Sequence, residues 1–241
     1  MLGWKPIDDM ATYWILFLLP ALVSLIKENR RIEKFRVARK AGRAAWLFVF
    51  VCLTLLIGFR FEVGGDWVNY FAYLDRVRGA DLDEVLAMGD PGYNFINWLS
   101  GELDWDIFGV NLFAGILFSL GLVVFCRHLP RPWLALAVAV PYMVIVVSMG
   151  YSRQGIALGI AMLGLVALTR HANLWFVFWI LLAATFHKTA VVLLPLAALA
   201  AARRRWLAIV WSGVSALLGY WAFLQDSVDT LYVNYVEAEY Q

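Results

Sequence analysis

The stretch SMGYSRQGIALGIAMLG (residues 148–164) places a permanently charged residue, Arg153, between two long apolar runs. The run before it is VAVPYMVIVVSM (138–149), and the run after it is GIALGIAMLGLVAL (155–168). Continuous apolar runs predict membrane-spanning helices, because the strands of a membrane barrel alternate between apolar and polar residues. No acidic residue lies near Arg153 in the sequence, so the fold must supply the reason for this cation.

The composition excludes an ordinary soluble domain. Of the 241 residues, 63% are hydrophobic and only 16% are charged, whereas about half of a soluble domain is apolar and about a quarter is charged. We therefore predict an all-α fold, a polytopic membrane helix bundle that forms a single integral membrane domain over residues 1–241. About eight spans are expected, at residues 10–26, 45–60, 107–126, 133–149, 154–169, 173–186, 189–202 and 206–224.

The distribution of charge predicts the orientation of these spans. Segment 27–43 carries eight basic residues and two acids, and 14 of the 20 lysines and arginines fall on the same side of the predicted bundle. Basic loops face the cytoplasm in most membrane proteins. The sequence therefore predicts cytoplasmic basic loops, an N-terminus on the outer side, and 16 of the 18 acids on the outer side.

The outer loop at residues 61–106 contains ten acids but only two basic residues, Arg76 and Arg78, which we interpret as solvated. Its apolar residues recur at helical spacing, and Asp90 followed by Pro91 is typical of a helix start. We expect two amphipathic helices on the outer membrane surface. Their predicted stripes are Trp67, Phe71, Leu74 and Arg78 in the first helix, and Ile96, Leu99 and Leu103 in the second.

Arg153 is expected at the outer edge of the membrane, at the start of a helix. The span that follows has 16 residues, roughly 24 Å of helix against a hydrocarbon core of about 30 Å. Small residues along that span predict close packing against other helices. A guanidinium beside free backbone N–H groups suits a phosphate, although the alternative of contact with lipid headgroups stays open. The small residues are Gly155, Ala157, Gly159, Ala161 and Gly164.

Further charged and aromatic residues are expected near the same outer face. His187 and Lys188 lie in a predicted outer turn, where the imidazole is either a general base, a phosphate contact or a simple hydrogen-bonding group. Asp66 follows two glycines that permit a tight turn over the bundle. The candidate catalytic residues are His187 and Asp66, and the candidate substrate-binding residues are Arg153, Arg60, Lys188, Trp67, Tyr70 and Gln154.

Four short motifs occur in an order and at positions that resemble a known family. They are RFEVGGDWVNY (60–70), DPGYNFINWL (90–99), SRQGIALGIAMLG (152–164) and FHKTAVVLLPL (186–196). The chain resembles the EpsG family and the wider Wzy-type, O-antigen-polymerase-like polysaccharide polymerases, with Arg153 and Gly164 matching the R-x10-G pattern of such polymerases. The resemblance implies a GT-C-like membrane bundle.

The resemblance also implies an activity at the outer face of the bacterial plasma (inner) membrane. Such proteins join oligosaccharide repeat units carried on undecaprenyl diphosphate into exopolysaccharide or O-antigen. The implied partners are the lipid-linked oligosaccharide, membrane lipids, a chain-length regulator and a flippase, with no nucleic acid. No metal-ligand motif is present in the sequence, so we expect no metal or other cofactor. Family members are usually longer, which leaves a fragment and a short family member as alternatives.

Two other functions remain open from the sequence. A flippase for the same lipid-linked saccharide would be a transporter, although transporters usually have internal repeats and polar residues at mid-membrane. A non-catalytic membrane subunit of polysaccharide assembly is the other alternative. The charges of this chain gather at one face, which favours surface chemistry over passage across the membrane.

Overall fold

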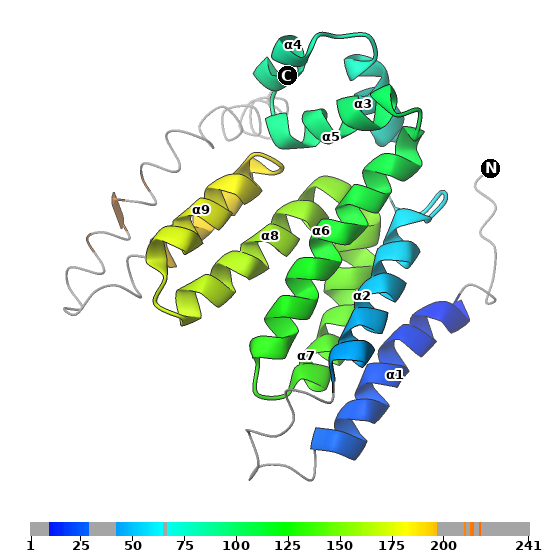
Figure 1. Cartoon of the computed structure of the whole chain (residues 1–241), viewed down its shortest axis with the longest axis vertical. Coiled ribbons are helices and arrows are strands. Elements are labelled where there is room, and N and C mark those ends of the chain that lie inside the picture. Colours follow the sequence, from blue (N-terminus) through cyan, green and yellow to red (C-terminus); the bar gives the residue numbers. More distant parts are fainter. Residues whose placement is uncertain are drawn as a thin grey trace, which may run out of the picture.

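The computed structural model describes residues 10–28, 42–64 and 67–196, together with 210, 213, 214 and 217. The described part is a helix bundle with a helical cap (Figure 1), which confirms the all-α prediction. The α-helices are α1 (Met10–Glu28), α2 (Arg43–Gly58), α3 (Trp67–Val77), α4 (Leu82–Ala87), α5 (Pro91–Glu102), α6 (Asp106–His128), α7 (Pro132–Ala139), α8 (Ser152–Thr169) and α9 (Asn173–Ala184). The π-helix η1 (Val140–Ser148) continues α7, and the 3-10 helix η2 (Lys188–Leu193) follows α9.

Three of the described helices, α1, α6 and α8, are long and apolar enough to cross a membrane. Shorter apolar helices are α2, the continuous α7–η1 segment and α9. These six coincide with the first six predicted spans. The predicted span 189–202 begins as η2, and its part beyond residue 196 lies outside the described residues. The span 206–224 lies outside them apart from four residues, so a total of eight spans stays a prediction.

Helix α8 packs between α6 and α9 through its small residues, as the sequence predicts (Figure 1). A Cβ atom added to Gly159 would lie 2.5 Å from the Cα of Phe118 in α6. A Cβ added to Gly164 would lie 3.1 Å from the Cβ of Trp179 in α9. The absence of side chains at these positions therefore lets the three helices approach closely.

Helices α3, α4 and α5 form a cap over one end of the bundle (Figure 1). The inner face of α3 differs from the predicted stripe, because Phe71 is 38% exposed and Arg78 lies on the surface. Tyr70 and Val77 are buried in their place, beside Trp67 and Leu74. The hydroxyl of Tyr70 accepts a hydrogen bond from the backbone, so this partly polar side chain can be buried on the inner face of α3. The predicted stripe was based on apolar residues alone and did not include it.

The predicted stripe of α5 is also wrong at its end, because Leu103 is 45% exposed. Polar side chains fill the inner face instead, with Asn94, Asn97 and Ser100 all at most 1% exposed. Each of these three side chains donates a hydrogen bond to a backbone carbonyl, which offsets part of the cost of removing it from water. The side-chain oxygens of Asn94 and Asn97 are buried without a hydrogen-bond partner among the described residues. The cap thus faces the bundle with a partly polar layer.

Candidate functional site

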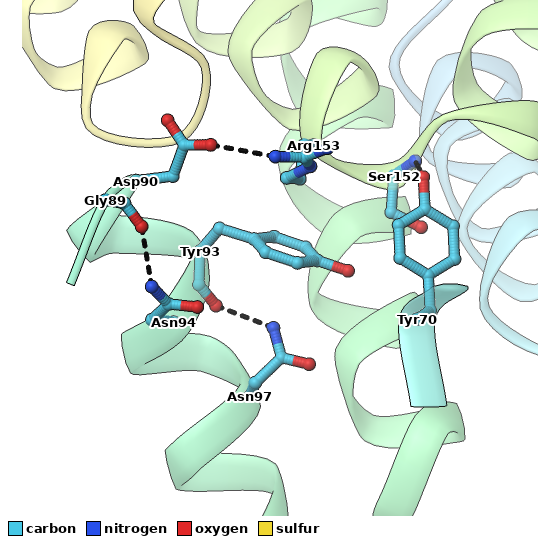
Figure 2. A network of polar contacts seen from close by, with 8 residues as sticks. All are labelled: Tyr70, Gly89, Asp90, Tyr93, Asn94, Asn97, Ser152 and Arg153. Carbon is cyan, nitrogen blue, oxygen red and sulfur yellow. Dashed lines mark hydrogen bonds and ion pairs between the residues drawn. The ribbon is translucent and has the colours of Figure 1, made fainter. Parts of the chain in front are cut away.

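The start of α8 is held in place by the cap. The π-helix η1 ends at Ser148, and α8 begins four residues later at Ser152. The backbone N–H of Ser152 donates a hydrogen bond of 2.8 Å to the hydroxyl of Tyr70 in α3 (Figure 2). This bond satisfies one of the free N–H groups at the helix start. Arg153, the next residue, therefore lies in the first turn of α8, directly under the cap.

Arg153 has a carboxylate partner that lies 63 residues earlier in the chain. Its Nη1 lies 2.9 Å from Oδ2 of Asp90, and the two side chains are 28% and 18% exposed (Figure 2). Asp90 directly precedes α5, as the Asp-Pro signal predicts, but its side chain makes no capping hydrogen bond. The carboxylate reaches across to Arg153 instead. Sequence reasoning identified the helix start and missed the ion pair.

Two tyrosine rings complete the surroundings of the Arg153 guanidinium. Its central carbon lies 4.9 Å from the ring centroid of Tyr73 and 6.0 Å from that of Tyr93. Cations are attracted to the faces of such rings. Tyr73 comes from α3 and Tyr93 from α5, so both helices of the cap contribute to holding one charged side chain at the end of the bundle.

His187 lies at the same end, in the turn between α9 and η2. The backbone N–H of Gly92 in α5 donates a hydrogen bond of 3.0 Å to the carbonyl of Thr185, which brings this turn against the cap. Burial lowers the pKa of His187, the positive charges of Arg153 and Lys188 lower it further, and the carboxylate of Asp90 opposes them. A neutral imidazole beside a carboxylate is able to accept a proton.

A polar cavity of about 230 Å³ opens beside Arg153. It lies between α3 and the start of α8, and cationic side chains line it from both helices. A cavity with this lining can hold an anionic group. The lining residues are Asn69, Tyr70, Ala72, Tyr73, Arg76 and Arg153. Arg76 is exposed, as the sequence predicts, and it also lines the cavity, which the sequence alone does not indicate.

The other predicted site residues lie in varied positions. Trp67 is 8% exposed and packs edge-to-face against Phe61 and Phe71, which is an anchoring position. Gln154 is exposed on α8, and Lys188 is half-buried at the start of η2. Asp66 lies outside the described residues.

Arg60 is buried near this end of the bundle and does not line the cavity. Its Nη1 donates to the carbonyls of Ile57 and Ser148, at 3.3 and 3.0 Å, and its Nη2 donates to the hydroxyl of Ser152. That hydroxyl also contacts the side-chain oxygen of Asn111 in α6, at 3.3 Å. Arg60 thus joins the ends of α2 and η1 to the start of α8, a position that supports Arg153 from below.

The described residues contain no group of three or more His, Cys, Asp or Glu side chains placed to hold a metal ion. Arg153 and Arg76 line the cavity, Asp90 pairs with Arg153, and His187 lies in the adjoining turn, where the charges of Arg153 and Asp90 act on it.

Comparison with protein families identifies the family of this chain. The model of the EpsG family matches residues 43–241, which includes every described residue of the cap, the cavity and the His187 turn. The chain matches no curated protein and no solved structure.

Proposed function

The chain belongs to the EpsG family, and from this membership and the geometry of its site we propose that it is a membrane glycosyl-polymerase. It joins oligosaccharide repeat units carried on undecaprenyl diphosphate at the outer face of the bacterial plasma membrane. The observation that carries the proposal is the Arg153–Asp90 ion pair beside a polar cavity under the cap, with the turn of His187 hydrogen-bonded to the same cap. Such a site offers a cation for a phosphate and a base for a hydroxyl.

The proposed reaction needs both of these groups. A sugar hydroxyl of one lipid-linked unit attacks the anomeric carbon at the lipid-linked end of the growing chain. The new C–O bond forms at that carbon, and the bond from the carbon to the diphosphate oxygen breaks. The diphosphate leaves on its lipid carrier with the bonding electron pair, and the hydroxyl proton passes to the base.

Arg153 stabilises the leaving diphosphate in this proposal. Negative charge grows on the bridging oxygen as the bond breaks, and a fixed guanidinium at a helix N-terminus is already oriented toward it. Asp90 forms an ion pair with Arg153 and keeps this cation partly buried. A diphosphate that binds here replaces Asp90 as the partner of Arg153. Lys188 adds a second positive charge near His187.

His187 accepts the hydroxyl proton. Its lowered pKa keeps the imidazole neutral near pH 7, the form that can act as a base. The cap brings the ring close enough to Arg153 and Asp90 for their charges to act on it. The proton then passes to solvent before the next transfer.

Replacing Arg153 with Ala tests the assignment. Loss of one such charged contact typically lowers a rate by about a hundredfold or more. We expect polymer to disappear while single lipid-linked units accumulate on the outer leaflet, with the protein still inserted in the membrane. His187→Ala should give the same phenotype. Arg78→Ala is the matched control, because Arg78 is exposed directly after the end of α3 and pairs with Asp75 at 3.8 Å.

Normal polymer from inserted Arg153→Ala protein would refute the proposed role of Arg153. Accumulation on the inner leaflet instead would identify a flippase, since that defect precedes translocation. A retained biological effect in the double variant Arg153→Ala, His187→Ala would indicate a non-catalytic subunit.

A further inference from the structure

Two arginines that come from different helices both lie against the ring of Tyr73. The guanidinium carbon of Arg153 lies 4.9 Å from the centre of the Tyr73 ring, and that of Arg76 lies 5.2 Å from it. The two carbons therefore lie no farther apart than the sum of these distances. Both side chains line the same cavity of about 230 Å³. Two permanent positive charges thus meet at one opening.

The charges at this cavity do not cancel. Arg153 is paired with Asp90 at 2.9 Å, whereas Arg76 forms no ion pair within the described residues. Like charges repel, and bringing two of them to one cavity costs free energy unless a ring or an anion compensates. The Tyr73 ring compensates in part, because its face attracts both cations. Among the described residues that line the cavity, Arg76 and Arg153 are the charged ones and none is acidic.

Arg78 shows that the position of Arg76 is specific. Arg78 directly follows α3, with its N–H still bonded to the carbonyl of Leu74, and carries the same charge, but it does not line the cavity. It pairs with Asp75, and both of these side chains are about 70% exposed, at 69% and 71%. Helical geometry places residues two apart on different faces. The charge of Arg76 is therefore directed to the cavity, and the charge of Arg78 is directed to solvent.

We propose that Arg76 is a specificity-determining residue that binds the second phosphate of a diphosphate group, while Arg153 binds the first. The cavity then discriminates a lipid diphosphate from a lipid monophosphate. The identity of the lipid rests on the proposed function, whereas the preference for two linked phosphates follows from the two guanidinium groups around Tyr73. A planar guanidinium can donate two parallel hydrogen bonds to the oxygens of one phosphate. Two guanidinium groups at one cavity therefore favour two linked phosphates.

Affinity measurements on the purified full chain in nanodiscs test the proposal. The probes are undecaprenyl diphosphate, undecaprenyl monophosphate and inorganic pyrophosphate, and the variants are Arg76→Ala and Arg78→Ala. A charge-assisted contact is worth about 1.4 kcal/mol or more, which is tenfold in Kd. We expect Arg76→Ala to weaken diphosphate binding about tenfold and to leave monophosphate binding unchanged. Arg78→Ala should bind both lipids as the original chain does.

Three results would overturn the proposal. The first is that Arg76→Ala binds the diphosphate lipid as tightly as the original chain, and the second is that it loses equal affinity for both lipids. The third is that Arg78→Ala loses as much affinity as Arg76→Ala, which would indicate general attraction by a charged surface. Inorganic pyrophosphate distinguishes the sources of the anion. If pyrophosphate competes with the lipid and Arg76→Ala weakens this competition, the cavity recognises the phosphates alone. If pyrophosphate does not compete but Arg76→Ala still weakens binding of the lipid diphosphate, the cavity recognises the lipid diphosphate.

The binding result is independent of polymerisation. The affinities are measured without turnover, and Arg76 is exposed on the surface of the cap, so its replacement should leave folding intact. A chain that fails the polymer test but keeps an Arg76-dependent diphosphate preference would refute the proposed reaction alone. A chain that polymerises through Arg153 but shows no Arg76 effect would refute the second phosphate contact alone.

Discussion

Arg153 illustrates how the fold reduces the cost of a membrane-edge cation. A charged residue at the centre of the bilayer costs on the order of 3 kcal/mol on insertion scales, and less toward the edge. The carboxylate of Asp90 at 2.9 Å and the Tyr73 ring at 4.9 Å both favour the charged form. The same contacts set a condition on binding, because any anion that reaches Arg153 must compete with Asp90 or share the guanidinium with it.

His187 predicts the pH dependence of the proposed reaction. The ordinary pKa of histidine is about 6.5, and burial together with Arg153 and Lys188 lowers the pKa of His187 in the folded chain. The ring is therefore neutral at pH 7 and gains a proton only as the pH falls below that ordinary value. If His187 is the base, the polymerisation rate should fall on the acidic side with a midpoint below about 6.5, measured as initial rates in membranes between about pH 5 and 8.

The charged neighbours of His187 give this prediction its controls. Lys188→Met removes a positive charge that lowers the pKa of His187, so the acidic midpoint should move to higher pH. Asp90→Asn removes a negative charge that raises the pKa of His187, so the midpoint should move to lower pH. Shifts in the same direction in both variants, or no shift in either, would assign the acidic limb to another group.

At the scale of the elements, α8 holds the site because it packs without side chains against α6. Gly159 contacts Phe118, and Gly121 of α6 packs directly against the carbonyl of Gly159. Protein interiors are closely packed, so an extra carbon atom at such a contact is accommodated only if the backbone moves. A displacement of α8 would move Arg153 away from Asp90, since Arg153 lies in its first turn. The geometry of the site thus depends on the close packing of α8 against α6.

Gly159→Ala should therefore destabilise the chain and impair the site. The added Cβ would lie 2.5 Å from the Cα of Phe118, and overpacking of this kind typically costs about 1–3 kcal/mol. Thermal unfolding in detergent measures the loss. Gly101→Ala in α5 is the control, because nothing lies within 4 Å of its added Cβ. That change should leave stability equal or raise it by about 0.5–1 kcal/mol. Equal stability of both variants would contradict the close α6–α8 approach.

Local patterns in the sequence predicted most of the elements. Apolar runs located α1, α2, α6, α7–η1, α8 and α9, and apolar residues at helical spacing indicated α3 and α5. The small residues of α8 indicated its packed face, and Asp90–Pro91 marked the start of α5. The short helix α4 carried no such signal and was not predicted. Each of these signals lies within one segment. The Asp90–Arg153 pair was missed because its members lie 63 residues apart. The polar inner face of α5 was missed because apolar periodicity gives no weight to Asn97 or Ser100, which find backbone acceptors only in the folded chain.

At the scale of the whole molecule, the two ends of the bundle differ in character. The cap and the cavity lie at one end, while α1 ends and α2 begins at the opposite end (Figure 1). The sequence between those two helices is strongly basic, with eight basic residues in segment 27–43. Basic segments stay on the cytoplasmic side because translocating them is unfavourable. The cap should therefore face outward, where sugar units on their lipid carriers would be available for transfer.

Single cysteines at the two ends test this orientation. Asp81, exposed before α4 in the cap, and Arg131, exposed before α7 at the opposite end, are suitable positions. Both native cysteines, Cys52 and Cys126, are free and are first replaced with Ala. A membrane-impermeant maleimide should label Asp81→Cys in intact cells or spheroplasts and label Arg131→Cys only after permeabilisation. The reverse pattern would place Arg153, Asp90 and His187 at the cytoplasmic face, and polymerisation of externally displayed units by this site would then be excluded.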